Sequence, residues 1–140
     1  MSKRKGTRGE KLVVEWFEQN GWYAQRTGGS GGGISDARPD VVALRRNANG
    51  RTDCVVTEIK SRSDGTVRFE NDEIKQVRTV SAKSGALGLF IVRPDLRLSE
   101  HPHMYAFTVD ELKENNKSRS VTKSMLPGPT IAEKIKAHFI

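Results

Sequence analysis

Two acidic residues and a lysine stand at positions where a single β-hairpin could bring them together. Asp40 precedes one run of β-forming residues, Glu58 and Lys60 end a second, and the Asn49-Gly50 turn signal lies between the two runs. Because side chains alternate along a strand, Glu58 and Lys60 project to the same side. Two carboxylates beside a main-chain carbonyl suit Mg²⁺, and an adjacent ammonium can hold an attacking water or a scissile phosphate. This pattern indicates metal-assisted phosphodiester hydrolysis.

Each fragment of this pattern also has an ordinary structural explanation. A Glu-x-Lys pair at the end of a strand is usually a solvated charge pair, and Pro39-Asp40 is usually part of a turn. The order, spacing and strand context of the residues together favour the catalytic interpretation more than either fragment does alone. The rest of the sequence has to decide between the structural explanation and the catalytic interpretation.

The composition limits the class of protein. A chain of 140 residues is long enough for one domain, here 1–140, with a core over 5–115 and a less certain tail over 116–140. The formal charge of +7 indicates an anionic polymer or surface as partner. No apolar run is long enough to cross a bilayer and the basic N-terminus is no secretory signal, so we expect no membrane association and a cytoplasmic location. Cys54 is the only cysteine, which excludes an internal disulfide and a thiolate zinc cluster.

The elements expected around these residues describe an α/β fold, with a mixed central β-sheet flanked by helices. The periodicity and the turn signals predict helices over 7–20 and 71–84, the second capped by Asn71, a short helix from about 110, and a final helix from 130 with a Thr130-x-x-Glu133 capping box. They predict strands over 22–26, 41–44, 54–59, 67–69, 87–92 and 104–108, the last at a sheet edge.

Glu10 has two interpretations at this stage. The pattern Thr7-x-x-Glu10 is a capping box, which would explain the glutamate structurally. However, Glu10 also shares a helical stripe with Val13, Val14 and Phe17, which would face the core. An acid at the end of a buried stripe needs a partner, and a metal site could provide one. Both interpretations stay open.

The glycine-rich segment 27–33 is no nucleotide-binding loop, because it lacks the Gly-Lys-Ser/Thr ending and no helix follows it directly. We expect a mobile flap that brings Ser30 to a nucleic-acid backbone, although a plain surface loop explains the composition equally well. Basic residues cluster around the candidate carboxylates and would form a rim that admits a polyanion: Lys3, Arg4, Lys5, Arg8, Arg26, Arg38, Arg45, Arg46, Arg62 and Arg68.

Assembled in this order, the residues resemble those of the archaeal Holliday-junction resolvases, which belong to the PD-(D/E)xK restriction-endonuclease-like nucleases. The resemblance covers about residues 5–92. It rests on Arg4-Lys5-Gly6-x-x-x-Glu10, the glycine- and serine-rich segment, Pro39-Asp40-Val-Val-Ala, Glu58-Ile-Lys60-Ser61 and Lys83-Ser84-Gly85.

The resemblance implies a restriction-endonuclease-like fold and a role for each matching residue. Asp40 and Glu58 would bind Mg²⁺, with Mn²⁺ able to take its place, and Lys60 would support the attacking water. Glu10 would complete the acidic cluster as a further metal-binding residue, and Ser30 would act from the flap. The residues expected to contact DNA are Lys3, Arg4, Lys5, Arg8, Ser30, Arg38 and Arg62.

The implied activity is that of an endodeoxyribonuclease that resolves four-way DNA junctions as a homodimer, by paired nicks that leave 5'-phosphate ends. Two alternatives remain: another PD-(D/E)xK nuclease acting on duplex, flap or damaged DNA, and a non-catalytic DNA-binding module, against which the intact carboxylates argue. The chain also departs from the family pattern, because Asp72-Glu73 stands where a glutamine is common in the second helix. No site residue is therefore assigned there, and no dimer surface.

Overall fold

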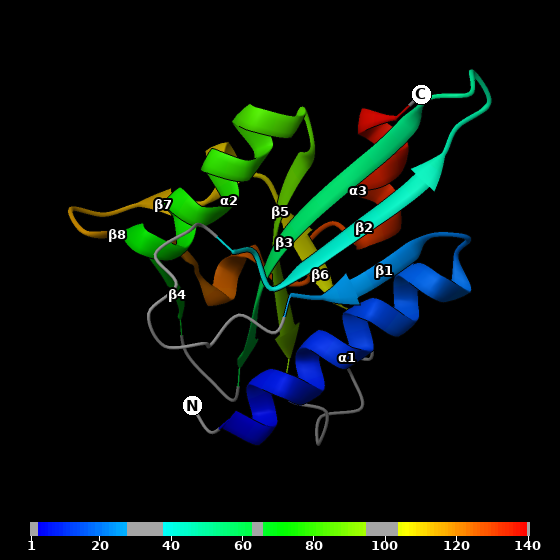
Figure 1. Cartoon of the computed structure of the whole chain (residues 1–140). Helices are drawn as coiled ribbons and strands as arrows, with labels where there is room; N and C mark the ends of the chain where they lie inside the picture. Colours follow the sequence, from blue (N-terminus) through cyan, green and yellow to red (C-terminus); the bar gives the residue numbers. More distant parts are fainter. Residues whose placement is uncertain (1–2, 28–37, 63–65, 95–103, 140) are drawn as a thin grey trace.

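The computed structural model describes residues 3–27, 38–62, 66–94 and 104–139. A five-stranded mixed sheet forms its centre, with strand order β1-β2-β3-β5-β6 (Figure 1). Only the β3–β5 pair is parallel; the other neighbours run antiparallel. The α/β class with a mixed central sheet, predicted from the sequence, is thus confirmed. The strands are β1 Tyr23–Arg26, β2 Val41–Arg46, β3 Thr52–Arg62, β5 Leu87–Pro94 and β6 Tyr105–Phe107.

Helices cover both faces of this sheet. One face packs against α1 (Lys3–Gln19) and α3 (Ile131–His138), the other against α2 (Asn71–Ser84) and a second, three-stranded sheet. That sheet has the order β4-β8-β7, with β4 Val67–Glu70, β7 Lys113–Glu114 and β8 Ser118–Val121. Single-turn 3₁₀ helices η1 (Val109–Glu111) and η2 (Lys123–Met125) flank β7 and β8. None of the described helices is long and apolar enough to cross a membrane.

Several predicted element boundaries were wrong. Helix α1 begins at Lys3, so Thr7 lies inside it and cannot cap it, since a cap residue has non-helical backbone. Helix α2 does start with Asn71, but its N-cap is Glu70, whose N–H donates to Glu73 Oε1 at 2.9 Å. The helix expected from about 110 is only the one-turn η1. Strands β7 and β8 were missed.

The β2–β3 hairpin was predicted correctly and is longer than expected. Asn47 organises its loop, since Asn47 Oδ1 accepts hydrogen bonds from the N–H groups of Asn49 and Arg51. Gly50 has φ +80°, which glycine adopts without steric cost. Strand β3 continues to Arg62, so that Lys60 is paired with β5 rather than lying in a loop.

A close approach between α2 and β5 fixes the position of that helix. A Cβ atom at Gly88 would lie 2.7 Å from Val77 Cγ1, which is closer than real packing permits. The absence of a side chain at Gly88 therefore lets α2 lie directly against the sheet. This determines where the first turn of α2, with Glu73, stands relative to β3.

Candidate active site

Asp40 is held against β3 next to Glu58. Its backbone N–H donates to the Thr57 carbonyl at 2.8 Å, and its Oδ2 accepts from the Ile59 N–H at 2.9 Å. These bonds flank Glu58, which lies between Thr57 and Ile59 and is only 6% exposed. The structure therefore brings together the two carboxylates that the sequence pattern singled out.

Burial perturbs both acids. It is the largest cause that raises the pKa of Glu58 to about 10, and the charges of Asp40 and Glu73 add to the increase. It is also the largest cause for Asp40, whose pKa rises from its ordinary 3.8 to about 6 in spite of the hydrogen bond from Ile59. Buried acids that repel one another in this way are typical of functional sites.

Lys60 lies beside these acids, paired with a glutamate that the sequence analysis had left out of the site. Lys60 Nζ is 2.8 Å from Glu73 Oε2, and the Glu73 side chain also lies close enough to Glu58 to raise its pKa. Glu73 comes from the first turn of α2, where the sequence shows Asp72-Glu73 instead of the expected glutamine. This departure from the family pattern was the sequence feature that could have identified Glu73 as a site residue, because an acid at this position can join the cluster as a glutamine would.

Glu10 approaches the cluster from α1. A Cβ atom at the preceding Gly9 would be 3.1 Å from Ser61 Oγ, so this turn of α1 lies close to β3. Glu10 Oε1 accepts a hydrogen bond from Arg26 Nε at 3.1 Å, and its charge contributes to the raised pKa of Asp40. Glu10 is thus a neighbour of the site, engaged by an arginine and not by a helix cap.

Only part of the expected basic rim lies near the acids. Arg45 and Arg46 lie at the far end of β2, about 17 and 20 Å along the strand from Asp40, so their placement around the carboxylates was wrong. Arg8 is exposed on α1, while Arg38 directly precedes Pro39-Asp40 and is half-buried. Ser30 lies outside the described residues, as do the side chains of Lys3, Arg4, Lys5 and Arg62.

No three His, Cys, Asp or Glu side chains of the described segments form a ready-made metal site. The donor set nevertheless fits a hard divalent cation, since it consists of carboxylate oxygens. In addition, Glu58 Oε1 is buried and accepts no hydrogen bond from any described group. A buried acceptor without a donor costs about 1–3 kcal/mol, and a cation between Glu58 and Asp40 would remove that cost.

Comparison with known proteins agrees with this geometry. The family model described as archaeal Holliday junction resolvase (hjc) matches residues 1–138. Among solved structures, the chain is similar to Archaeoglobus fulgidus Hjc, described as a Holliday junction resolvase from an archaeal hyperthermophile. The two share 27% sequence identity over 92% of this chain and 98% of that chain, with a TM-score of 0.76. A search of the curated proteins finds no match. The chain belongs to the archaeal Holliday junction resolvase family and is therefore a nuclease of the junction-resolving class.

Proposed function

We propose that this resolvase cuts four-way DNA junctions by Mg²⁺-dependent hydrolysis, with Asp40 and Glu58 as the metal ligands. The observation that carries the proposal is the buried, unsatisfied Glu58 Oε1 beside Asp40. Glu10, whose charge acts on Asp40, would complete the acidic cluster around the metal. Mn²⁺, which accepts the same oxygen ligands, would take the place of Mg²⁺. A cytoplasmic location, expected from the sequence, fits this role.

Each residue of the cluster has a distinct part in this mechanism. A divalent cation bound to Asp40 and Glu58 would polarise the scissile phosphate and lower the pKa of a water molecule. Lys60, whose charge acts on both Asp40 and Glu58, would donate hydrogen bonds to that water or to a phosphate oxygen and so offset developing negative charge. Glu73 holds Lys60 in place. The backbone hydrogen bond from Asp40 to Thr57 holds the main chain against β3, and the hydrogen bond from the Ile59 N–H to Oδ2 keeps the Asp40 carboxylate from turning away.

The first prediction concerns the substrate. Four-way junctions should be cut at least about tenfold faster than forks and linear duplexes of the same sequence, because selection by shape and backbone contacts penalises DNA that cannot adopt the bound geometry. A cleavage assay on this panel, with Mg²⁺ in excess, measures the ratio. Equal cutting of the three substrates would reject junction selectivity and favour a nuclease for duplex or flap DNA.

The second prediction concerns Asp40. The change Asp40→Asn keeps the shape but removes a metal-binding charge, so cleavage should fall by about a thousandfold or more. Junction affinity should stay the same or increase, since one negative charge facing DNA is lost. Gel-shift and cleavage assays on one preparation separate the two effects. Asp110→Asn, at an exposed acid on η1, is the matched control; retained cutting by Asp40→Asn would show that the site is assigned wrongly.

The third prediction concerns the stability of the metal-free protein. In the folded protein the pKa values of Glu58 (about 10) and Asp40 (about 6) exceed their ordinary values of 4.5 and 3.8. The folded state therefore binds these protons more tightly than the unfolded state, and the free energy of unfolding decreases as the pH rises from the ordinary to the raised pKa values. In the presence of a chelator, Glu58→Gln should therefore be more stable than the parent, with an advantage that grows from pH 5 to pH 9 by up to about 1.4 kcal/mol per unit.

Thermal unfolding at a series of pH values measures this difference. Adding Mg²⁺ at pH 8 should stabilise the parent protein and leave Glu58→Gln nearly unchanged, since the variant lacks a ligand. A difference in stability that does not vary with pH would contradict the assignment of Glu58 as an acid kept protonated by burial.

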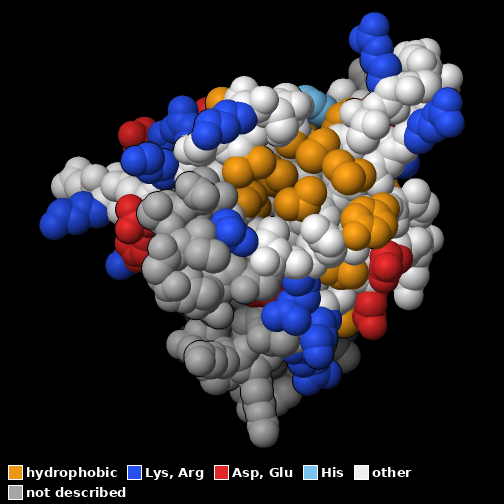
Figure 2. Space-filling view, viewed as in Figure 1, with side chains coloured by type: hydrophobic (Ala, Val, Ile, Leu, Met, Phe, Trp, Pro, Cys, Tyr) orange, Lys and Arg blue, Asp and Glu red, His pale blue; other side chains and the backbone are white. Residues whose placement is uncertain are grey.

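We also propose that the protein acts as a homodimer through an apolar face of the sheet. Tyr23, Leu44 and Cys54 are directly opposite one another on β1, β2 and β3. Tyr23 is 60% and Leu44 37% exposed. Figure 2 shows apolar side chains gathered over this part of the molecule, next to α2. Patches of this kind mark protein interfaces. A second copy is the fitting occupant, because resolving a junction needs two symmetric cuts and a twofold interface is self-complementary.

The fourth prediction tests this dimer. The parent protein should elute with about twice the chain mass of 15.6 kDa in size-exclusion chromatography with light scattering. Leu44→Glu should elute as a monomer, because two buried carboxylates would face each other across the twofold axis. On a supercoiled cruciform plasmid, the product should shift from linear DNA, which requires paired cuts, to nicked circles.

Ala132→Glu, on the exposed face of α3, provides the matched charge control and should remain dimeric. A parent protein that is monomeric at micromolar concentration would contradict the dimer. A dimeric Leu44→Glu variant would contradict the choice of this face.

A further inference from the structure

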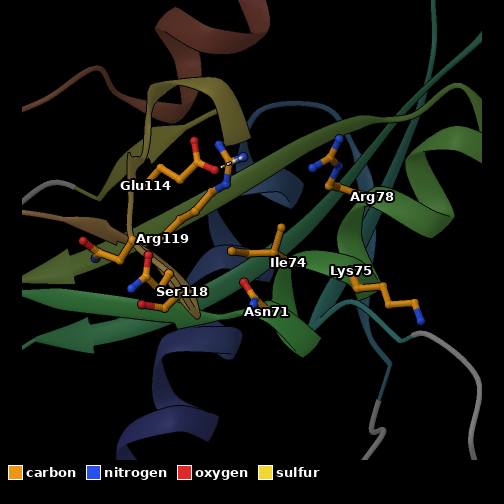
Figure 3. A pocket seen from close by; sticks show the side chains of 9 residues that line it. Asn71, Ile74, Lys75, Arg78, Glu114, Ser118 and Arg119 are labelled. Atoms are coloured by element: carbon orange, nitrogen blue, oxygen red, sulfur yellow. Dashed lines mark ion pairs between the residues drawn. The ribbon is translucent and has the colours of Figure 1, made fainter.

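A groove of about 430 Å³ lies between α2 and the β7–β8 hairpin (Figure 3). Lys75 and Arg78 line it from α2, and Arg119 lines it from β8. Lys75 and Arg78 lie about 200° and 140° around the helix from Glu73, so the groove is on the side of α2 turned away from the acidic cluster. Residues of two separate elements thus contribute cations to the lining of one groove outside the active site.

Two of these three cations, Lys75 and Arg78, form no ion pair with the described residues. Lys75 and Arg78 are exposed, and within the described part of the chain no carboxylate lies within ion-pair distance of either. Arg119 is anchored differently, because its Nη1 donates to the Val109 carbonyl at 3.2 Å. Its Nη2 is 3.8 Å from Glu114, whose side chain is 74% exposed, so this ion pair is weak. Three cations against one acid leave the groove positively charged.

The other groove residues specify the chemistry of the ligand. Asn71, Asn115, Asn116 and Ser118 contribute amide and hydroxyl groups that can donate hydrogen bonds, and Ile74 is the only large apolar side chain of the lining. Such a surface suits an anion with several oxygen acceptors and does not suit an apolar ligand. None of the lining residues is aromatic, so stacking on unpaired bases is not favoured.

We propose that this groove binds the phosphodiester backbone of a DNA arm, away from the phosphate that is cut. The proposal rests on the proposed junction-resolving function, because a four-way junction has arms that extend beyond the point of cleavage. A protein that selects the junction by shape must hold those arms by their backbones. Since α2 carries both Glu73 and the two groove cations, one rigid helix sets the distance between the cut and the arm contact.

The fifth prediction removes the two unengaged charges. The double variant Lys75→Ala/Arg78→Ala should bind a four-way junction about tenfold more weakly at 0.1 M salt. The slope of log Kd against log salt concentration should decrease by about 1–2, as the loss of one or two phosphate contacts requires. The single-turnover cleavage rate at saturating protein should remain unchanged. Fluorescence anisotropy over a salt series gives the first two quantities.

The double variant Arg51→Ala/Lys136→Ala loses the same charge at exposed positions of the β2–β3 loop and α3, and it is the matched control. It should change affinity and salt slope much less than the groove variant. Glu114→Gln, which removes the acid of the groove, should tighten binding. Equal effects of the two double variants would overturn the proposal, and so would a groove variant with normal affinity but slow single-turnover cleavage. A parent protein that binds junctions in this salt-dependent way without cutting them would instead contradict the proposed function and leave the groove supported.

Discussion

The burial of Glu58 is the constraint on which the rest of the candidate site depends. Strand β3 is hydrogen-bonded to β2 on one side and β5 on the other, so the Glu58 carboxylate cannot move out to solvent. Around it, four acids (Glu10, Asp40, Glu58 and Glu73) share two paired cations, Arg26 and Lys60. Among these described pairs the acids outnumber the cations, and a divalent cation would offset the excess negative charge. Without that cation, proton uptake by Glu58 lowers the repulsion; the pKa of Glu58 is raised first by burial and then by the charges of Asp40 and Glu73.

The sequence predicts the part of the site that is encoded locally. The Asn49-Gly50 turn and the two-residue alternation of β3 are enough to bring Asp40 close to Glu58 and to place Lys60 on the same side. Glu73 is different, because its position depends on how closely α2 packs against β5, and that distance is set by the missing side chain of Gly88. Strands β7 and β8 escaped prediction because they are short and mostly polar, without the apolar alternation that marks a strand.

Helix α2 contributes residues to the acidic cluster and to the groove, and it packs beside the apolar face. Its first turn brings Glu73 to the acidic cluster, its middle brings Lys75 and Arg78 to the groove, and Val80 packs into the core beside the apolar face. A helical period of 3.6 residues distributes these side chains around one rigid rod. The helix therefore holds the acidic cluster, the groove and the apolar face at fixed distances from one another.

The Lys60–Glu73 pair shows how Lys60 can be held in place by an ion pair and still donate hydrogen bonds to a water or a phosphate oxygen. Glu73 does not depend on Lys60 alone, because its Oε1 accepts a hydrogen bond from the Glu70 N–H at the start of α2 while Oε2 faces the ammonium at 2.8 Å. If Lys60 turns one of its three N–H donors toward a phosphate oxygen or a water, the helix cap still holds Glu73 in position. A lysine on β3 paired with a capped glutamate is therefore oriented before DNA binds, and the entropic cost of ordering its long side chain has already been met on folding. This arrangement favours a lysine in the centre of the sheet over one on a surface loop, where each binding event would have to order it again.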